Sequence, residues 1–171
     1  LQGYEGHAVM LPEPEQRRLA ADAAMAKLTG VRAFIEQSGL PVSIVSGGGP
    51  GTYKYTGMYP GVAEVQAGSH ATMHARSRSL LPEFRPALGL LATVISKPLP
   101  GRVITDAGMK SITHEFGLPP VLKPEGLATT KLSEEHGTQE GQGAASLRIG
   151  DKILLQPTHG CTTINLHERY Y

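Results

Sequence analysis

A histidine and the chain's only cysteine stand two residues apart near the C-terminal end, at His159 and Cys161. They follow an apolar run, so we expect the segment to be extended, with side chains two apart on the same side. An imidazole nitrogen and a thiolate together suit a borderline-soft divalent ion such as zinc. Water or substrate would complete the coordination, as in a catalytic metal site. Spacing alone leaves an incidental pair as the simpler interpretation.

The composition of the 171 residues excludes several classes of function. A hydrophobic content of 40% with 18% charged residues is typical of a globular chain and argues against disorder. The net charge of +1 gives no electrostatic basis for binding nucleic acid or an anionic membrane. No apolar run approaches the roughly 20 residues that cross a bilayer. One cysteine cannot form an internal disulfide, which favours a cytoplasmic setting.

The first half of the chain predicts a helix followed by a strand and a glycine-rich loop. Proline in the first turn, a glycine at position 39 and an apolar stripe predict the helix over residues 14–38. The stripe comprises Leu19, Ala23, Ala26, Leu28, Phe34 and Ile35. A strand over 41–46 then enters the loop 47–52, where absent side chains let backbone N–H groups approach a phosphate. The loop lacks the lysine and the spacing of nucleotide-binding motifs, and a plain flexible loop is the alternative.

The pattern changes near residues 82–86, where we place a domain boundary. Strands over 90–96 and 102–106, separated by a turn, indicate an antiparallel β domain because no helix divides them. We expect a proline-broken loop over 114–126, a flexible hairpin tip over 137–143, and a return strand within 147–155. Glu134, Glu135 and His136 read as a solvated face.

Six blocks in one order resemble the D-serine dehydratase and D-threonine aldolase family of fold-type III, alanine-racemase-like enzymes. The blocks are residues 3–7, 46–53, 61–69, 106–110, 134–137 and 157–167. The resemblance implies an α/β plus β fold: residues 1–85 as the last part of a (β/α)8 barrel that binds pyridoxal phosphate, and residues 86–171 as an antiparallel β domain carrying the metal motif. The block 106–110 reads as a buried Asp106–Lys110 pair that fixes a loop.

The resemblance also implies the roles of individual residues. His7 becomes a candidate acid or base, and His159 and Cys161 become ligands of a divalent metal, with zinc first and manganese or magnesium as alternatives. The candidates for binding pyridoxal phosphate are Tyr4, Gly48, Gly49, Thr52, Gly68 and Ser69. Three positions depart from the usual family residues: Pro50 replaces threonine, His70 replaces tyrosine and His74 replaces aspartate. We expect both histidines to be exposed.

The function implied by the resemblance is that of a lyase acting on D-3-hydroxy amino acids. Cys161 favours a D-serine dehydratase, which releases a 2-oxo acid and ammonia; a D-threonine aldolase, which releases glycine and an aldehyde, is the alternative. A racemase or a non-catalytic protein binding pyridoxal phosphate on the same fold is also consistent, as is an unrelated α+β domain. A homodimer is implied. No lysine stands where the family has its Schiff-base lysine, so we expect a fragment that is inactive alone.

Overall fold

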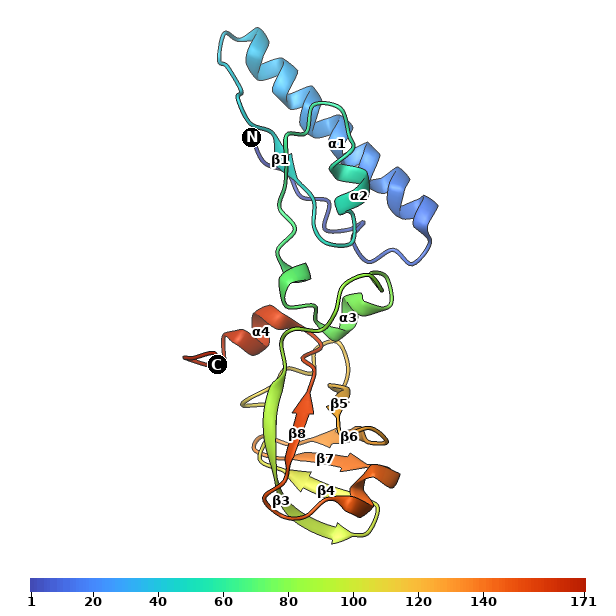
Figure 1. Cartoon of the computed structure of the whole chain (residues 1–171). Helices are drawn as coiled ribbons and strands as arrows, with labels where there is room; N and C mark the ends of the chain where they lie inside the picture. The colour runs from blue at the N-terminus through green and yellow to red at the C-terminus, as the bar shows by residue number, and fades with distance from the viewer. The chain divides into compact units, whose positions relative to one another are not determined.

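Two units make up the chain, and the computed structural model describes all residues from 1 to 171 (Figure 1). Unit 1 comprises Leu1–Ala71 and Leu80–Glu83, and unit 2 comprises Thr72–Ser79 and Phe84–Tyr171. The helices lack the combination of length and apolar character that crossing a bilayer requires.

The predicted first helix is confirmed as α1 (Pro14–Gln37), which continues through Gly30. Proline fits its first turn because a helix leaves those N–H groups unpaired, and Gly39 follows its end with φ +81°. The predicted apolar stripe is only partly correct. Leu28 is buried beside Met25, whereas Leu19 and Phe34 are 54% and 70% exposed. The face that packs in unit 1 is therefore rotated from the one that hydrophobicity alone selected.

A short parallel pair organises the rest of unit 1. β1 (Ser46–Gly47) pairs with β2 (Glu64–Val65), and α2 (Tyr53–Thr56) lies between them in the chain. Ladder pairing begins only at Ser46, so the strand is shorter than the predicted 41–46. Both strands run in the same direction, which places the glycine loop after β1 and the segment after β2 at one edge of the pair. Beyond β2 comes the 3-10 turn η1 (Ser69–Ala71).

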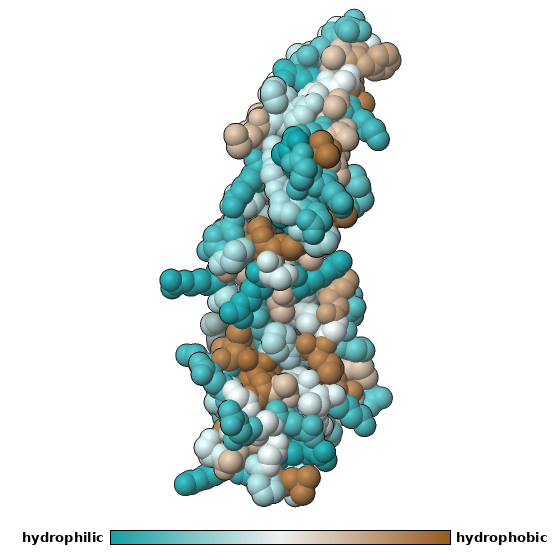
Figure 2. All heavy atoms as spheres, turned by 90° about the vertical axis from the view of Figure 1, so that its right-hand side faces the viewer, coloured by the Kyte–Doolittle hydropathy of each residue, from teal (hydrophilic) through white to brown (hydrophobic).

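Unit 2 is built on a six-stranded antiparallel sheet in the order β5-β8-β3-β4-β7-β6. The bounds are β3 (Leu90–Leu99), β4 (Arg102–Thr105), β5 (Val121–Lys123), β6 (Ala128–Leu132), β7 (Gly137–Glu140) and β8 (Lys152–Leu155). The predicted strands over 90–96 and 102–106 and their antiparallel pairing are confirmed. Val94, Val103 and Ile153 are completely buried and belong to one core cluster. Apolar side chains also reach the surface, where Figure 2 shows brown patches among polar residues; Leu91 and Ile149 are 64% and 69% exposed.

One loop prediction in unit 2 is wrong, and another is only partly correct. The expected flexible tip over 137–143 contains β7, which pairs with β4 on one side and β6 on the other. Its residues are polar, yet a strand between two neighbours has its backbone groups satisfied on both sides, and Gln139 is completely buried. The expected loop over 114–126 contains β5, which pairs with β8 at the sheet edge.

The buried Asp106–Lys110 pair is also a wrong prediction. The Asp106 carboxylate accepts a hydrogen bond of 2.7 Å from the Thr93 backbone N–H. The Lys110 ammonium instead pairs with Glu135, and both side chains are more than half exposed. Exposed ion pairs of this kind add little to stability because water and salt screen them.

Three short helical turns complete unit 2. They are α3 (Ala75–Arg78), η2 (Gln142–Ser146) and α4 (Gly160–Ile164). α4 corrects the expectation that the His159–Cys161 segment is extended. His159 itself is extended with φ −138° and ψ 123°, but the helix begins at the next residue. Cys161 therefore lies in a helical turn, and the alternation of a strand does not govern the direction of its side chain.

Candidate functional site

His159 precedes α4 and is oriented by a carboxylate. Its Nδ1 hydrogen-bonds to Glu115 Oε1, and the Thr162 hydroxyl donates to the same oxygen at 3.0 Å. A carboxylate only accepts, so Nδ1 carries a proton in this contact, and Nε2 has no protein hydrogen-bond partner. The hydrogen bond from His159 lowers the pKa of Glu115 below its ordinary value. This arrangement, with a carboxylate on one ring nitrogen and the other nitrogen available, is typical of metal-binding histidines.

Cys161 is exposed and is the second residue of α4. Nowhere in the chain do three or more His, Cys, Asp or Glu side chains already converge as a metal centre. The assignment of His159 and Cys161 as metal ligands stays a prediction. The donor set nevertheless fits a divalent ion, because a neutral imidazole nitrogen and a thiolate are ligands that zinc accepts.

His74 is the residue whose environment sequence reasoning missed. It was expected to be exposed, but only 8% of its surface is accessible. Its Nε2 lies 3.0 Å from the Ser77 hydroxyl, and its Nδ1 is buried without a hydrogen-bond partner. Burial lowers the pKa of His74, and the nearby His159 and Arg76 lower it further. The only signal in the sequence was the imidazole at a position where the family usually has aspartate.

Aromatic rings surround the imidazole of His159. The His74 ring lies edge-on to it, with ring centroids 5.6 Å apart and planes 74° apart. The Phe116 ring also contacts His159, with ring centroids 5.1 Å apart. The guanidinium carbon of Arg76 lies 3.6 Å from the centre of the Phe116 ring. We call His74, Glu115 and His159 the imidazole cluster; Phe116 and Arg76 flank it.

Glu5 supports the glycine loop of unit 1 through hydrogen bonds, and the sequence analysis did not single this residue out. Glu5 is completely buried; it accepts a 3.1 Å hydrogen bond from the Gly48 N–H and another from the Thr56 hydroxyl. The Gly49 N–H donates to Thr52 Oγ1 at 3.2 Å. Both predicted glycine donors therefore already have protein acceptors. Gly48 has φ +84°, a conformation that favours glycine.

The remaining predicted cofactor residues divide between two segments of unit 1. The Tyr4 ring, 66% exposed, lies against Gly49, where an added Cβ would come within 3.1 Å of it. His7 is exposed in the turn that follows. Gly68 faces open space, and Ser69 begins η1 beyond β2. The accessible backbone at Gly68 and the ring over Gly49 fit a cofactor with a flat ring and a phosphate.

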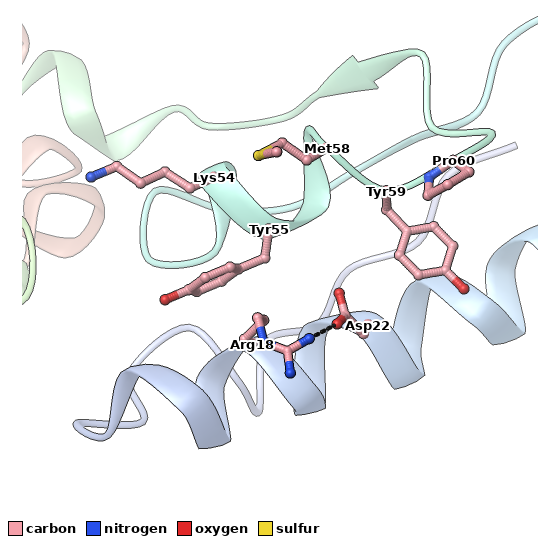
Figure 3. A pocket seen from close by; sticks show the side chains of 7 residues that line it. All are labelled: Arg18, Asp22, Lys54, Tyr55, Met58, Tyr59 and Pro60. Atoms are coloured by element: carbon pink, nitrogen blue, oxygen red, sulfur yellow. Dashed lines mark hydrogen bonds and ion pairs between the residues drawn. The ribbon is translucent and has the colours of Figure 1, made fainter.

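A pocket in unit 1 lies apart from these residues (Figure 3). It has a volume of about 360 Å³, and the rings of Tyr55 and Tyr59 point toward α1 across it. Its other lining residues are Arg18, Asp22, Lys54, Met58 and Pro60. An Arg18–Asp22 ion pair of 2.7 Å occupies one wall. None of the predicted site residues lines the pocket, so it adds nothing to the candidate chemistry.

Comparison with sequence families and characterised proteins gives consistent matches. A family model described as a putative serine dehydratase domain matches residues 87–171. The D-threonine aldolase of an Arthrobacter species is 34% identical over 173 residues, which cover 98% of this chain and 46% of that protein. The chain thus spans about half the length of the curated relatives it matches.

Solved structures share the fold over nearly the whole chain. The D-threonine aldolase of Filomicrobium marinum has a TM-score of 0.88 at 30% identity, covering 98% of this chain and 47% of that one. An alanine-racemase-like protein of Idiomarina loihiensis has a TM-score of 0.82 at 21% identity, covering 98% and 50%. A mutant D-threo-3-hydroxyaspartate dehydratase, described as the metal-free form, has a TM-score of 0.80 at 25% identity, covering 97% and 50%. The predicted fold class is confirmed.

Proposed function

Because this chain belongs to the D-serine dehydratase and D-threonine aldolase family, we propose that it forms part of a pyridoxal-phosphate- and metal-dependent lyase acting on D-3-hydroxy amino acids. The observation that carries this proposal is the His159 imidazole, whose Nδ1 is held by Glu115 while Nε2 remains available. The relatives' names, which include aldolases and a dehydratase of such amino acids, support the substrate class.

In the proposed enzyme, His159 and Cys161 hold the divalent metal, and zinc is our first choice for it. The Glu115 carboxylate keeps the His159 ring in the tautomer that presents Nε2, and the Thr162 hydroxyl restrains that carboxylate. When bound, the metal would polarise the substrate's β-hydroxyl as a leaving group or favour its alkoxide. The chain's own residues therefore supply an oriented imidazole with one ring nitrogen available to the metal.

The cofactor belongs to residues 1–85 in this proposal, and the metal to residues 86–171. Tyr4 would face the cofactor ring, and the open backbone at Gly68 with the Ser69 hydroxyl would receive its phosphate. Thr52 and the glycine pair Gly48–Gly49 would shape the other side of that phosphate site. Pyridoxal phosphate supplies an electron sink that makes bonds at the substrate Cα labile. His7, exposed in its turn, would exchange a proton with the substrate.

Two reaction outcomes remain, and different observations favour them. The serine dehydratase family model and the cysteine at 161 favour β-elimination, in which the Cβ–O bond breaks and a 2-oxo acid and ammonia are released. The two curated relatives with 33–34% identity are named aldolases, which favours cleavage of Cα–Cβ to glycine and an aldehyde. We propose the dehydratase first and the aldolase as its alternative. A homodimer is part of the proposal.

The test uses the protein at its full natural length, loaded with pyridoxal phosphate and supplied with D-threonine, with and without a chelator. A 2-oxo acid and ammonia that disappear on chelation would support the dehydratase. Glycine and acetaldehyde that disappear on chelation would replace it with the aldolase. Turnover that survives complete metal removal, or D-to-L interconversion alone, would contradict the metal-dependent lyase.

A further inference from the structure

The two imidazoles of the imidazole cluster share one pattern of hydrogen bonding. In each ring one nitrogen is held by the protein: Nδ1 of His159 by Glu115 and Nε2 of His74 by the Ser77 hydroxyl. In each ring the other nitrogen has no protein partner. For His74 this nitrogen is Nδ1, which is buried; only 8% of the residue's surface is accessible. Metal-binding histidines show this pattern, since the second nitrogen is fixed by an outer partner.

The lone nitrogen of His74 needs an explanation. A buried polar atom left without a partner costs about 1–3 kcal/mol; five other side-chain atoms of this chain are in the same situation, and His74 Nδ1 differs from them in belonging to a ring that lies against a second imidazole. A histidine with a purely structural role would have both ring nitrogens hydrogen-bonded, or its ring would lie in an apolar setting. His74 instead faces a second imidazole and lies near the start of α4, since an added Cβ at Gly160 would be 3.9 Å from His74 Nδ1.

The separation of the rings agrees with a shared ion. Two imidazoles bound to one tetrahedral ion at metal–nitrogen distances of about 2.0–2.1 Å have ring centroids about 5.2 Å apart. The His74 and His159 centroids are 5.6 Å apart, with planes 74° apart. The two rings therefore lie at about the separation that one shared ion would require.

We propose that His74 is a third protein ligand of the metal, binding through Nδ1 beside His159 and Cys161. This inference rests on the proposed function, which supplies the metal and its first two ligands. It assigns a role to the position where the usual family residue is aspartate. Imidazole is a softer ligand than carboxylate, so His74 shifts the site toward zinc and cobalt and away from magnesium.

The experiment uses the full-length protein stripped of metal, with Co²⁺ as the probe. Cobalt reports its ligands through visible absorption bands, and its affinity follows from competition with a chelator. The variants are His74→Asn, which removes the imidazole but keeps a polar side chain, and His159→Ala. His136→Ala is the matched control, because it removes an exposed imidazole from the same unit.

We expect His74→Asn to lower the Co²⁺ affinity about 100-fold and to shift the visible bands, whereas His136→Ala changes neither. Ser77→Ala keeps the His74 ring but removes the hydroxyl that holds it, so a loss of about tenfold is expected. The Ser77 variant also covers the case in which His74→Asn does not fold.

The remaining outcomes separate this inference from the proposed function. If His159→Ala abolishes binding while His74→Asn binds Co²⁺ with the affinity or the spectrum of the wild type, His74 is not a ligand and the proposed function stands. If the wild-type protein binds no Co²⁺, the inference and the metal-dependent function both fail.

Discussion

The candidate sites of the two units satisfy their polar groups in opposite ways. In unit 1 the N–H groups of Gly48 and Gly49 already donate to Glu5 and Thr52, so both of these donors are occupied. In unit 2, His74 Nδ1 is buried without a partner and His159 Nε2 has none either. Unit 1 therefore offers a rigid backbone surface, whereas unit 2 offers side-chain atoms whose hydrogen-bonding or coordination capacity a ligand would satisfy. Substitutions should therefore damage the units by different routes.

A side chain added to the tightly packed backbone of unit 1 should cause the greatest loss of stability. An added Cβ at Gly51 would overlap the carbonyl oxygen of Val9, and backbone cannot move aside as a flexible side chain can. We expect Gly51→Ala to lower the free energy of unfolding of unit 1 by about 3 kcal/mol or more, measured by urea denaturation of the full-length protein. Gly30→Ala is the control, because its Cβ meets no atom and alanine favours the helix. Equal stability of the Gly51 variant and the wild type would contradict the rigid-backbone description.

The buried carboxylate of unit 1 should have the next largest effect. In Glu5→Gln one acceptor oxygen becomes an NH₂ group that faces either the Gly48 N–H or the Thr56 hydroxyl. We expect a loss of about 1–3 kcal/mol in stability and weaker binding of pyridoxal phosphate, read by denaturation and by cofactor absorbance. The exposed Glu13→Gln should change neither quantity. Wild-type cofactor affinity in the Glu5 variant would show that the loop does not need this support.

Glu115 is the corresponding carboxylate of unit 2, and its effect should appear in metal binding. Glu115→Gln keeps the shape but removes the charge that favours the Nδ1–H tautomer of His159. We expect a loss of Co²⁺ affinity of about tenfold. Glu134→Gln, an exposed change in the same unit, is the comparison. Unchanged affinity in the Glu115 variant would mean that the carboxylate does not orient the ring.

The pH dependence of unit 2 should report the burial of His74. Because burial lowers its pKa below the ordinary 6.5, the unfolded chain binds more protons than the folded one between the two values. The contribution to stability is present above the ordinary pKa and is lost as pH falls toward the folded one, with a slope of at most about 1.4 kcal/mol per pH unit. Urea denaturation of metal-free protein across this range should show the slope, and His74→Asn should remove it. A slope unchanged in that variant would assign the effect to another group.

The smallest expected effect concerns the flank of the imidazole cluster. Arg76→Ala removes the guanidinium that lies 3.6 Å from the Phe116 ring centre, and such exposed contacts contribute about 0.5–1 kcal/mol. We expect that loss in urea denaturation with unchanged Co²⁺ affinity. Arg78→Ala, two residues along, should leave stability unchanged. A large fall in metal affinity would instead place Arg76 within the site.

Local signals predicted part of the regular structure. α1 was predicted because proline, glycine and apolar spacing are signals that act over a few helical turns. β3 and β4 were predicted because turn-forming residues separate them. β7 was missed because its residues are polar, and only pairing with strands on both sides makes them a central strand. The side of α1 that packs was misjudged for a related reason, since burial depends on what lies opposite.

For the site, the amino-acid sequence establishes which residue types are present: a histidine and a cysteine two apart, a glycine loop, and an imidazole at position 74. It also carried enough ordered motifs to identify the family. Three contacts become visible only in the folded chain: His74 is buried against His159, Glu115 holds the His159 ring, and Glu5 accepts a hydrogen bond from the Gly48 N–H. Spacing along the chain fixes only local conformation, whereas burial and hydrogen-bond partners are set where distant segments meet.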